Sequence, residues 1–188
     1  MAKLLPGQVK ITPYKNKQTG IVEYKLAYSE DVSEAQASWL YAQMAQPRLT
    51  LLNRLDPKEN PVDKSFFETW EDRGYNPMSI RFSIFTSAAK RPKPKRYRVP
   101  LQRPGILYAK WARERYDATP DLICCWHWPV RKCDMRYFHH FFSMPTIGQS
   151  WSDHSSLWED MEKHGFDTET LKFEVHHAAP WVWDPAWD

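Results

Sequence analysis

The chain has 188 residues, a length typical of one domain or of a compact domain with long extensions. It contains 15 prolines and only 6 glycines, together with 10 tryptophans, 9 tyrosines and 9 phenylalanines, and this aromatic content excludes an intrinsically disordered protein. The net charge of +3 is unevenly spread: it is +1 over residues 1–89, +9 over 90–116 and −7 over 117–188. Such polarity predicts oriented contacts with different neighbours.

The apolar segments indicate no transport or membrane signal. No apolar run approaches the roughly 20 residues that cross a bilayer, so no transmembrane span is expected. Residues Met1–Gly7 are too short and too weakly apolar for a secretory signal and do not resemble a cleaved presequence. Three cysteines, two of them adjacent, cannot form a closed disulfide set, which favours a reducing compartment or buried free thiols.

The first third of the chain predicts a hairpin followed by a helix. Residues 8–13 and 21–28 are rich in β-forming residues, and a polar loop that ends in Gly20 separates them. Asp31 and Glu34 have the spacing of a capping box, which predicts a helix over 32–45. A second amphipathic stretch follows at 49–55.

The middle of the chain predicts a helix, a strand, an extended strap and another helix. A helix over 63–73 is closed by Gly74, and strict apolar alternation predicts a strand over 78–86. Prolines 92, 94, 100 and 104 exclude regular structure and predict an ordered, polyproline-like strap over 90–104. Residues 106–116 are expected to form a basic helix.

The last third is rich in aromatic residues. Residues 122–128 and 136–144 are expected to form short strands, and Ser152 is expected to cap a helix over 153–164 that Gly165 closes. Alternation predicts a final strand over 171–176, followed by an extended tail, 178–188. The predicted fold class is α+β, divided into an N-terminal part (1–89), the strap (90–105), a C-terminal half (106–177) and the tail (178–188).

The strap is the first candidate partner-binding segment. Its cations are Lys90, Arg91, Lys93, Lys95, Arg96 and Arg98. Held extended by proline, they could line a phosphate backbone, an acidic protein surface or anionic lipid head groups. Because the basic excess is confined to one part of the chain, a protein or membrane-surface neighbour is favoured over RNA. A solvated loop is the alternative.

The tail is the second candidate. It contains Trp181, Trp183 and Trp187, and exposed tryptophans at this density promote aggregation. We therefore expect a partner chain or the protein's own core to cover them, and the prolines favour the partner.

Cys125, His127, Cys133 and His139 are weak candidates for metal ligands. No zinc knuckle with the usual spacing is present, so buried cysteines are the favoured interpretation and no metal or other cofactor is predicted. The sequence lacks a phosphate-binding loop, a nucleophile elbow and a metalloprotease motif. The histidine pairs 139–140 and 176–177 remain candidates for acid–base chemistry, although adjacent histidines in a strand point to opposite faces.

The many prolines and tryptophans, the few glycines, the proline-stiffened strap and the absence of an enzyme motif resemble the traits of supernumerary subunits of mitochondrial assemblies. This resemblance implies a non-catalytic accessory subunit of a large inner-membrane assembly, either a respiratory-chain complex or ATP synthase, that clamps neighbouring subunits. Its partners would be other protein subunits, with possible contact to anionic lipid. One alternative is a mitochondrial ribosomal protein with the strap on rRNA. Another is a small nucleic-acid-processing enzyme that uses the paired histidines.

Overall fold

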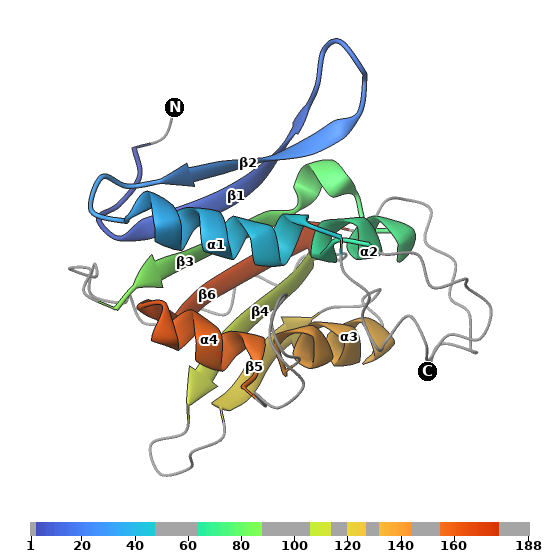
Figure 1. Cartoon of the computed structure of the whole chain (residues 1–188). Coiled ribbons are helices and arrows are strands. Elements are labelled where there is room, and N and C mark those ends of the chain that lie inside the picture. Colours follow the sequence, from blue (N-terminus) through green and yellow to red (C-terminus); the bar gives the residue numbers. More distant parts are fainter. Residues whose placement is uncertain are drawn as a thin grey trace.

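A computed structural model of the protein describes residues 3–47, 64–87, 106–113, 120–126, 132–143 and 155–176. These residues form an α+β fold in which four helices lie on one face of a six-stranded antiparallel sheet of order β2-β1-β3-β6-β4-β5 (Figure 1). The strands are β1 Gln8–Lys15, β2 Val22–Tyr28, β3 Arg81–Thr86, β4 Ile106–Arg113, β5 Pro120–Trp126 and β6 Phe166–His176. The helices are α1 Glu34–Ala45, α2 Phe66–Asp72, α3 Lys132–Ser143 and α4 Leu157–Lys163, with a 3₁₀ turn at Pro77–Ser79.

The predicted N-terminal hairpin is confirmed. Strands β1 and β2 pair from Val9 opposite Tyr28 to Lys15 opposite Val22, so β1 continues past Pro13, where the sequence predicted its end. The Ser29 amide donates to the Gln8 carbonyl and the Asn16 amide to the Ile21 carbonyl. Antiparallel strands alternate between hydrogen-bonded and non-hydrogen-bonded residue pairs, and Pro13 falls in a non-hydrogen-bonded pair with Tyr24. Its nitrogen, which has no hydrogen, therefore points away from β2, and no bond between the two strands is lost.

Three helices begin with the same reciprocal cap. Ser33, Ser65 and Ser156 each accept a hydrogen bond from the backbone three residues later, and the Gln or Glu at that position bonds back to the serine amide. The predicted box of Asp31 and Glu34 is therefore wrong. Asp31 instead accepts hydrogen bonds from the Gly7 amide (2.8 Å) and the Ser29 hydroxyl (2.6 Å), which tie the hairpin base to the loop before α1.

The predicted glycine ends of α2 and α4 are confirmed. Gly74 (φ 86°) and Gly165 (φ 83°) follow these helices in the left-handed conformation that glycine adopts without strain. Both helices are shorter than predicted, at seven residues each, and the cap of α4 is Ser156 rather than Ser152.

The two strands predicted from alternation lie in the middle of the sheet. Ile80, Phe82 and Ile84 are buried, which confirms the apolar face of residues 78–86. Met78 is 39% exposed because the Asn76 side chain accepts a hydrogen bond from its amide and sets a 3₁₀ turn, so β3 begins only at Arg81. In β6 the predicted segment 171–176 is confirmed, and the strand extends back to Phe166.

Two predicted elements are wrong. Residues 106–113 of the predicted helix form β4, which pairs with β5 on one side and β6 on the other. Such pairing satisfies backbone groups along the strand and overrides the helix-forming Ala, Lys and Arg of this segment. The predicted strand over 136–144 belongs to α3 instead. Tyr137 and Phe141, like Phe138 and Phe142, are four residues apart and buried, so the aromatic residues form the inner face of a helix.

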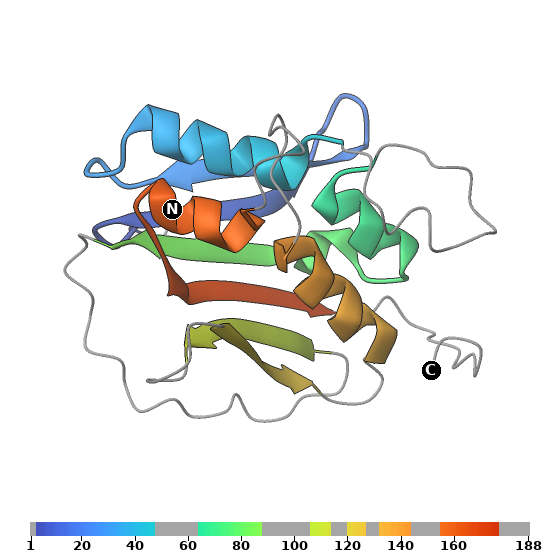
Figure 2. The same cartoon turned by 60° about the horizontal axis from the view of Figure 1, so that its bottom comes forward.

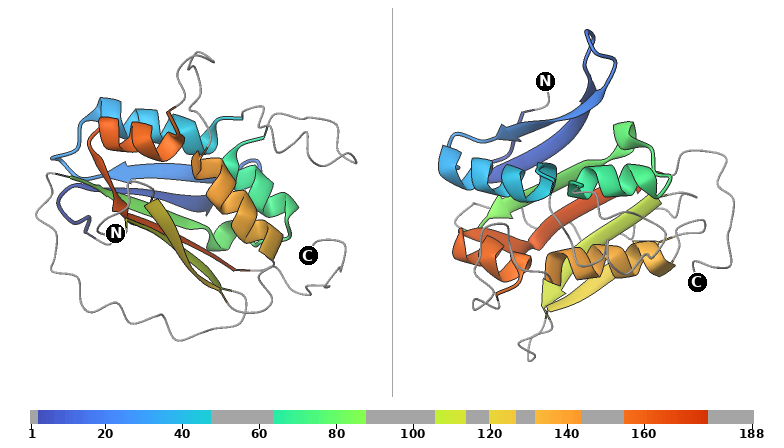
Figure 3. Two further views of the ribbon diagram at one scale, coloured as in Figure 1. Left: turned by 90° about the horizontal axis from the view of Figure 1, so that it is seen from below. Right: turned by 45° about the vertical axis from the view of Figure 1, so that its right-hand side comes forward.

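An aromatic core fills the space between the helices and the sheet. The Phe66 ring of α2 lies 4.3 Å from the Phe141 ring of α3, and the Trp70 ring lies 5.0 Å from the Phe173 ring of β6. These contacts join helices from the two halves of the sequence to one central strand. Figure 3 shows α2 and α3 on the same side of the sheet. One sheet thus contains strands from both 1–89 and 106–177.

Several predictions lie outside the described residues: the amphipathic stretch 49–55, the strap 90–104 and the tail 178–188. Strand β5 overlaps most of the predicted strand over 122–128. Among the helices that the structure describes, none has the length and apolar character needed to cross a membrane.

Candidate partner-binding face

The two faces of the sheet differ in what covers them. Views along the sheet show all four helices on the same side (Figures 2 and 3). No described helix covers the opposite side of strands β2, β1, β3 and β6, which we call the open face. Its side chains alternate with the buried core residues: Gln8, Lys10, Thr12, Tyr14, Glu23, Lys25, Ala27, Arg81, Ser83, Phe85, Asp167, Lys172 and Glu174.

Strand register places the cations among these side chains in two central rows across the sheet. In the first row Ser83 of β3 lies between Lys10 of β1 and Lys172 of β6. Strands lie about 4.8 Å apart, so the two lysine backbones are about 10 Å apart with the serine midway. In the second row Lys25 pairs with Thr12, and Arg81 pairs with Glu174. Extending the β1–β3 register by one residue places Thr12 beside Arg81.

The cations of the open face are accessible. Lys25, Arg81 and Lys172 are exposed, as is Glu174, whereas Lys10 is half-buried between its neighbours. The Arg81 guanidinium donates through Nη1 to the Met78 and Ile80 carbonyls, both at 2.9 Å. These bonds tether the arginine to the turn before β3.

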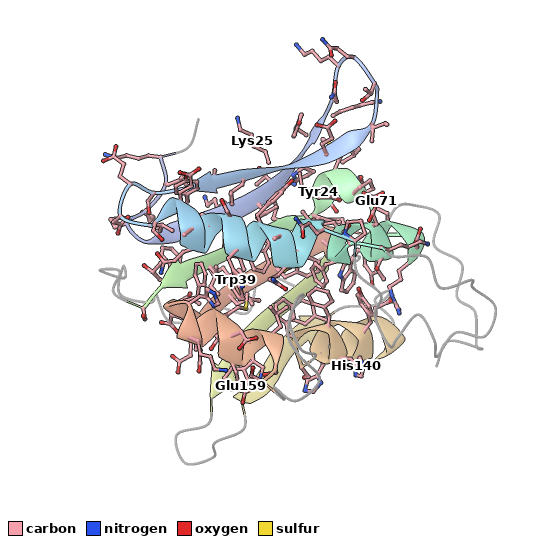
Figure 4. All side chains as sticks on the ribbon, in the orientation of Figure 1. Tyr24, Lys25, Trp39, Glu71, His140 and Glu159 are labelled. Atoms are coloured by element: carbon pink, nitrogen blue, oxygen red, sulfur yellow. The ribbon has the colours of Figure 1, made fainter. Side chains whose placement is uncertain are left out.

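The helical layer has the opposite charge. The four helices contain eight acidic residues and only three lysines or arginines. Figure 4 shows Lys25 projecting from β2, whereas Glu71 and Glu159 lie on the helices. The fold therefore places an acidic helical layer behind a sheet face whose two central rows contain four cations and the carboxylate of Glu174, with Glu23 and Asp167 in the rows on either side. This separation is invisible in the charge of +1 over residues 1–89.

Tyr24 and Glu71 form a second cluster with altered acidity (Figure 4). The Tyr24 hydroxyl donates to the Glu71 carboxylate at 3.0 Å, and the Tyr24 ring stacks on Phe67 at 4.0 Å. Burial raises the pKa of Tyr24 and, despite the hydrogen bond, also that of Glu71. Raised carboxyl pKa values are common in acid–base sites. Here each group satisfies the other within the packing of β2 against α2, so we interpret the pair as structural.

A third polar cluster joins α2 to α3. Asp134 is fully buried and accepts hydrogen bonds from Arg73 Nη1 at 2.7 Å and from the Tyr75 hydroxyl at 2.9 Å. The Arg73 guanidinium also lies 4.5 Å from the centre of the Tyr137 ring. Buried carboxylates need such partners, and this arrangement supplies them where the start of α3 meets the end of α2.

Most residues singled out from the sequence lie outside the described residues. These are the six strap cations, the three tail tryptophans, His127 and His177. Cys125 lies in β5, Cys133 and His139 lie in α3, and the His139 side chain is exposed. Within the described ranges, no group of three or more His, Cys, Asp or Glu residues is placed to hold a metal ion.

One of the two histidine pairs is placed differently from expectation. His139 and His140 lie on a helix, so the strand geometry expected for them is wrong. His176 is exposed at the end of β6.

The open face was missed in the sequence because its cations come from four separate strands. The signal that could have found it is the placement of Lys10, Lys25, Arg81 and Lys172 at the polar positions of alternating segments.

Comparison with protein-family models, with curated proteins and with solved structures finds no match to the chain.

Proposed function

We propose that the chain is a non-catalytic subunit of a larger assembly and that it binds an anionic neighbouring macromolecule through the open face. The observation that supports this proposal is the two-layer charge arrangement. Lys10, Lys25, Arg81 and Lys172 project from the face that no described helix covers, while the helices behind the sheet are acidic.

A polar face is common in antiparallel sheets, which often expose one side to water. A merely solvated face has no need of one predominant charge, since mixed charges solubilise equally well. In the two central rows of the open face, cations outnumber carboxylates by four to one, while Glu23 and Asp167 lie in the rows on either side. A surface of this kind raises the local concentration of an anionic partner and orients it before contact.

The position of the strap in the chain adds to this argument. The strap follows β3, which carries Arg81 and Ser83, and precedes β4. Both of these strands pair with β6. In the sequence, the six strap cations therefore lie between two strands that both pair with β6. The mitochondrial inner-membrane location remains a prediction that rests on the many prolines and tryptophans and the few glycines of the sequence.

Co-purification from native cells tests the proposal. A tagged chain is compared with a Lys25→Glu/Lys172→Glu variant and with a Lys3→Glu/Lys17→Glu control. The control changes the net charge equally but alters residues off the open face, and all four lysines are exposed, so folding should be preserved. Bound partners are identified by mass spectrometry and by nucleic-acid extraction.

We expect the wild type and the control to retain their partner and the open-face variant to lose it. Equal recovery of the partner with all three proteins would exclude the open face as the binding surface. Circular dichroism of each variant verifies that the fold is intact.

A further inference from the structure

Building on the proposed function, we infer that the anionic partner of the open face is a single-stranded nucleic acid. Its phosphates would cross the strands along the rows of cations and hydroxyls, and one base would stack on Phe85. Three features of the described residues lead to this choice over an acidic protein.

The first feature is the alternation of cations with hydroxyls. Across the sheet, Lys10 and Lys172 flank Ser83, and Thr12 lies between Lys25 and Arg81. Phosphate oxygens accept hydrogen bonds from Lys and Arg and also from Ser and Thr hydroxyls, and such contacts fix the position of the strand without reading its sequence. A chain of regularly spaced phosphates matches rows of this kind along its length.

The second feature is an aromatic side chain on the same face. Phe85 is half-buried and lies two residues from Ser83 on β3, opposite Gln8 of β1. The register between β3 and β6 shifts between Ser83 and Phe85, and the Phe85 amide donates to the Thr170 hydroxyl at 2.9 Å instead of joining a regular ladder. Phe85 is thereby fixed beside the first cation row. An aromatic ring beside a basic row is the combination that binds unpaired bases.

The third feature is the shape of the surface. The open face belongs to a sheet backed by helices, and no described helix projects from it (Figure 2). Reading a duplex groove requires an inserted helix or ribbon, whereas the splayed bases of a single strand can lie across a sheet. A single strand therefore fits this face better than a duplex.

The test is fluorescence anisotropy with the full chain and a labelled twelve-nucleotide oligouridine, with polyglutamate of equal charge as the competing anion. Four proteins are compared: the wild type, Lys25→Glu/Lys172→Glu, the Lys3→Glu/Lys17→Glu control, and Phe85→Leu. Leucine keeps an apolar side chain at position 85 but cannot stack on a base.

We expect the wild type and the control to bind the oligonucleotide, and the lysine variant to bind at least 10-fold more weakly. Loss of two phosphate contacts lowers the slope of log K against log salt by about 1.4. Phe85→Leu should weaken binding by about 5-fold to 160-fold with an unchanged salt slope, since base stacking contributes about 1–3 kcal/mol.

Equal oligonucleotide binding by the wild type and both open-face variants would overturn the inference and assign binding to the strap. Failure of the wild type to bind oligouridine, or its preference for polyglutamate, would also overturn it. If the lysine variant still lost its partner in native co-purification, the open face would remain the binding surface with an acidic protein as partner. If the lysine variant instead kept its partner in co-purification, the proposed function would be contradicted as well.

Discussion

The Tyr41 hydroxyl of α1 donates a 2.7 Å hydrogen bond to the backbone carbonyl of Tyr24 in β2. Strand β2 is an outer strand of the sheet, and its pairing pattern turns the Tyr24 carbonyl away from β1. A side chain from the helical layer therefore occupies an edge position that an additional strand would otherwise use. Exposed Lys25 next to it also disfavours edge-to-edge pairing.

Substitution Tyr41→Phe should release this edge position. We expect a loss of about 1 kcal/mol in the free energy of unfolding, the usual net contribution of one hydrogen bond, together with increased self-association. Chemical denaturation and sedimentation velocity measure the two effects. Combining Tyr41→Phe with Lys25→Val should increase self-association further. A monomeric double variant would show that other features protect this edge.

The buried Asp134 should be essential for stability. Asp134→Ala removes the carboxylate that accepts bonds from Arg73 and Tyr75, and breaking one side of a buried ion pair costs about 3–5 kcal/mol. Glu169→Ala, at an exposed position of β6, serves as the control and should change the unfolding free energy by less than about 0.5 kcal/mol. Similar urea midpoints for the two variants would contradict the role assigned to Asp134.

Gly165 and Gly20 offer a matched pair of substitutions. Both have positive φ, 83° and 72°, so alanine introduces a backbone strain of about 1–2 kcal/mol at each. A Cβ at Gly165 would also lie 3.0 Å from the side-chain nitrogen Nε2 of Gln36, whereas a Cβ at Gly20 would meet no atom within 4 Å. That Gln36 nitrogen donates to the His164 carbonyl at 2.7 Å.

Gly165→Ala should therefore lower the melting temperature more than Gly20→Ala. Gln36→Ala removes the crowded side chain but also the cap of α1 and the bond to His164, so it lowers the melting temperature by itself. In this background, Gly165→Ala and Gly20→Ala should cause similar further losses. Equal melting temperatures for the two glycine variants would mean that Gln36 moves aside freely.

Glu71 should make stability depend on pH. Burial raises its pKa above the ordinary value of 4.5, so the folded protein binds this proton more tightly than the unfolded chain. Its contribution to stability is full below the unfolded pKa and falls as the pH rises through the folded pKa.

Glu71→Gln can still accept the Tyr24 hydroxyl and carries no charge to desolvate. We expect this variant to match the wild type near pH 3.5 and to exceed it slightly at pH 7, by a few tenths of a kcal/mol, because the side chain is only half-buried. Thermal unfolding across this pH range measures the difference. A clear loss at pH 7 would mean that the bond from Tyr24 to the charged carboxylate outweighs burial.

The sequence was most informative where local signals and burial agree. The polar loop with Gly20 predicted the hairpin, and alternation predicted Phe82 and Ile84 of β3 as core residues. Sequence-based prediction failed where a segment fits both the spacing of a helix and the residue preferences of a strand. Phe138 and Phe142 favoured a strand by residue type, although their spacing of four fits the helix that buries them. Residues 106–113 contain good helix formers, and only the neighbouring strands β5 and β6 make them a strand.

The candidate site was harder to predict than the fold. Clustered charges such as the strap are visible in a linear sequence, but Lys10 and Lys172 are separated by 162 positions and share one row only because β3 lies between β1 and β6. A charge sum over a segment averages the two faces of every strand. It therefore concealed the separation of cations and carboxylates that the fold produces.

The central place of β6 constrains how the protein can be made. This strand is the last described element in the chain, yet β3 and β4 both pair with it, so it joins the β2-β1-β3 group to the β4-β5 hairpin. A nascent chain on the ribosome must expose both groups, with their apolar faces and unpaired edges, until residues 166–176 emerge. Chaperone binding during synthesis should be strongest in this interval, and early termination before Phe166 would leave two sheet fragments with no strand to unite them.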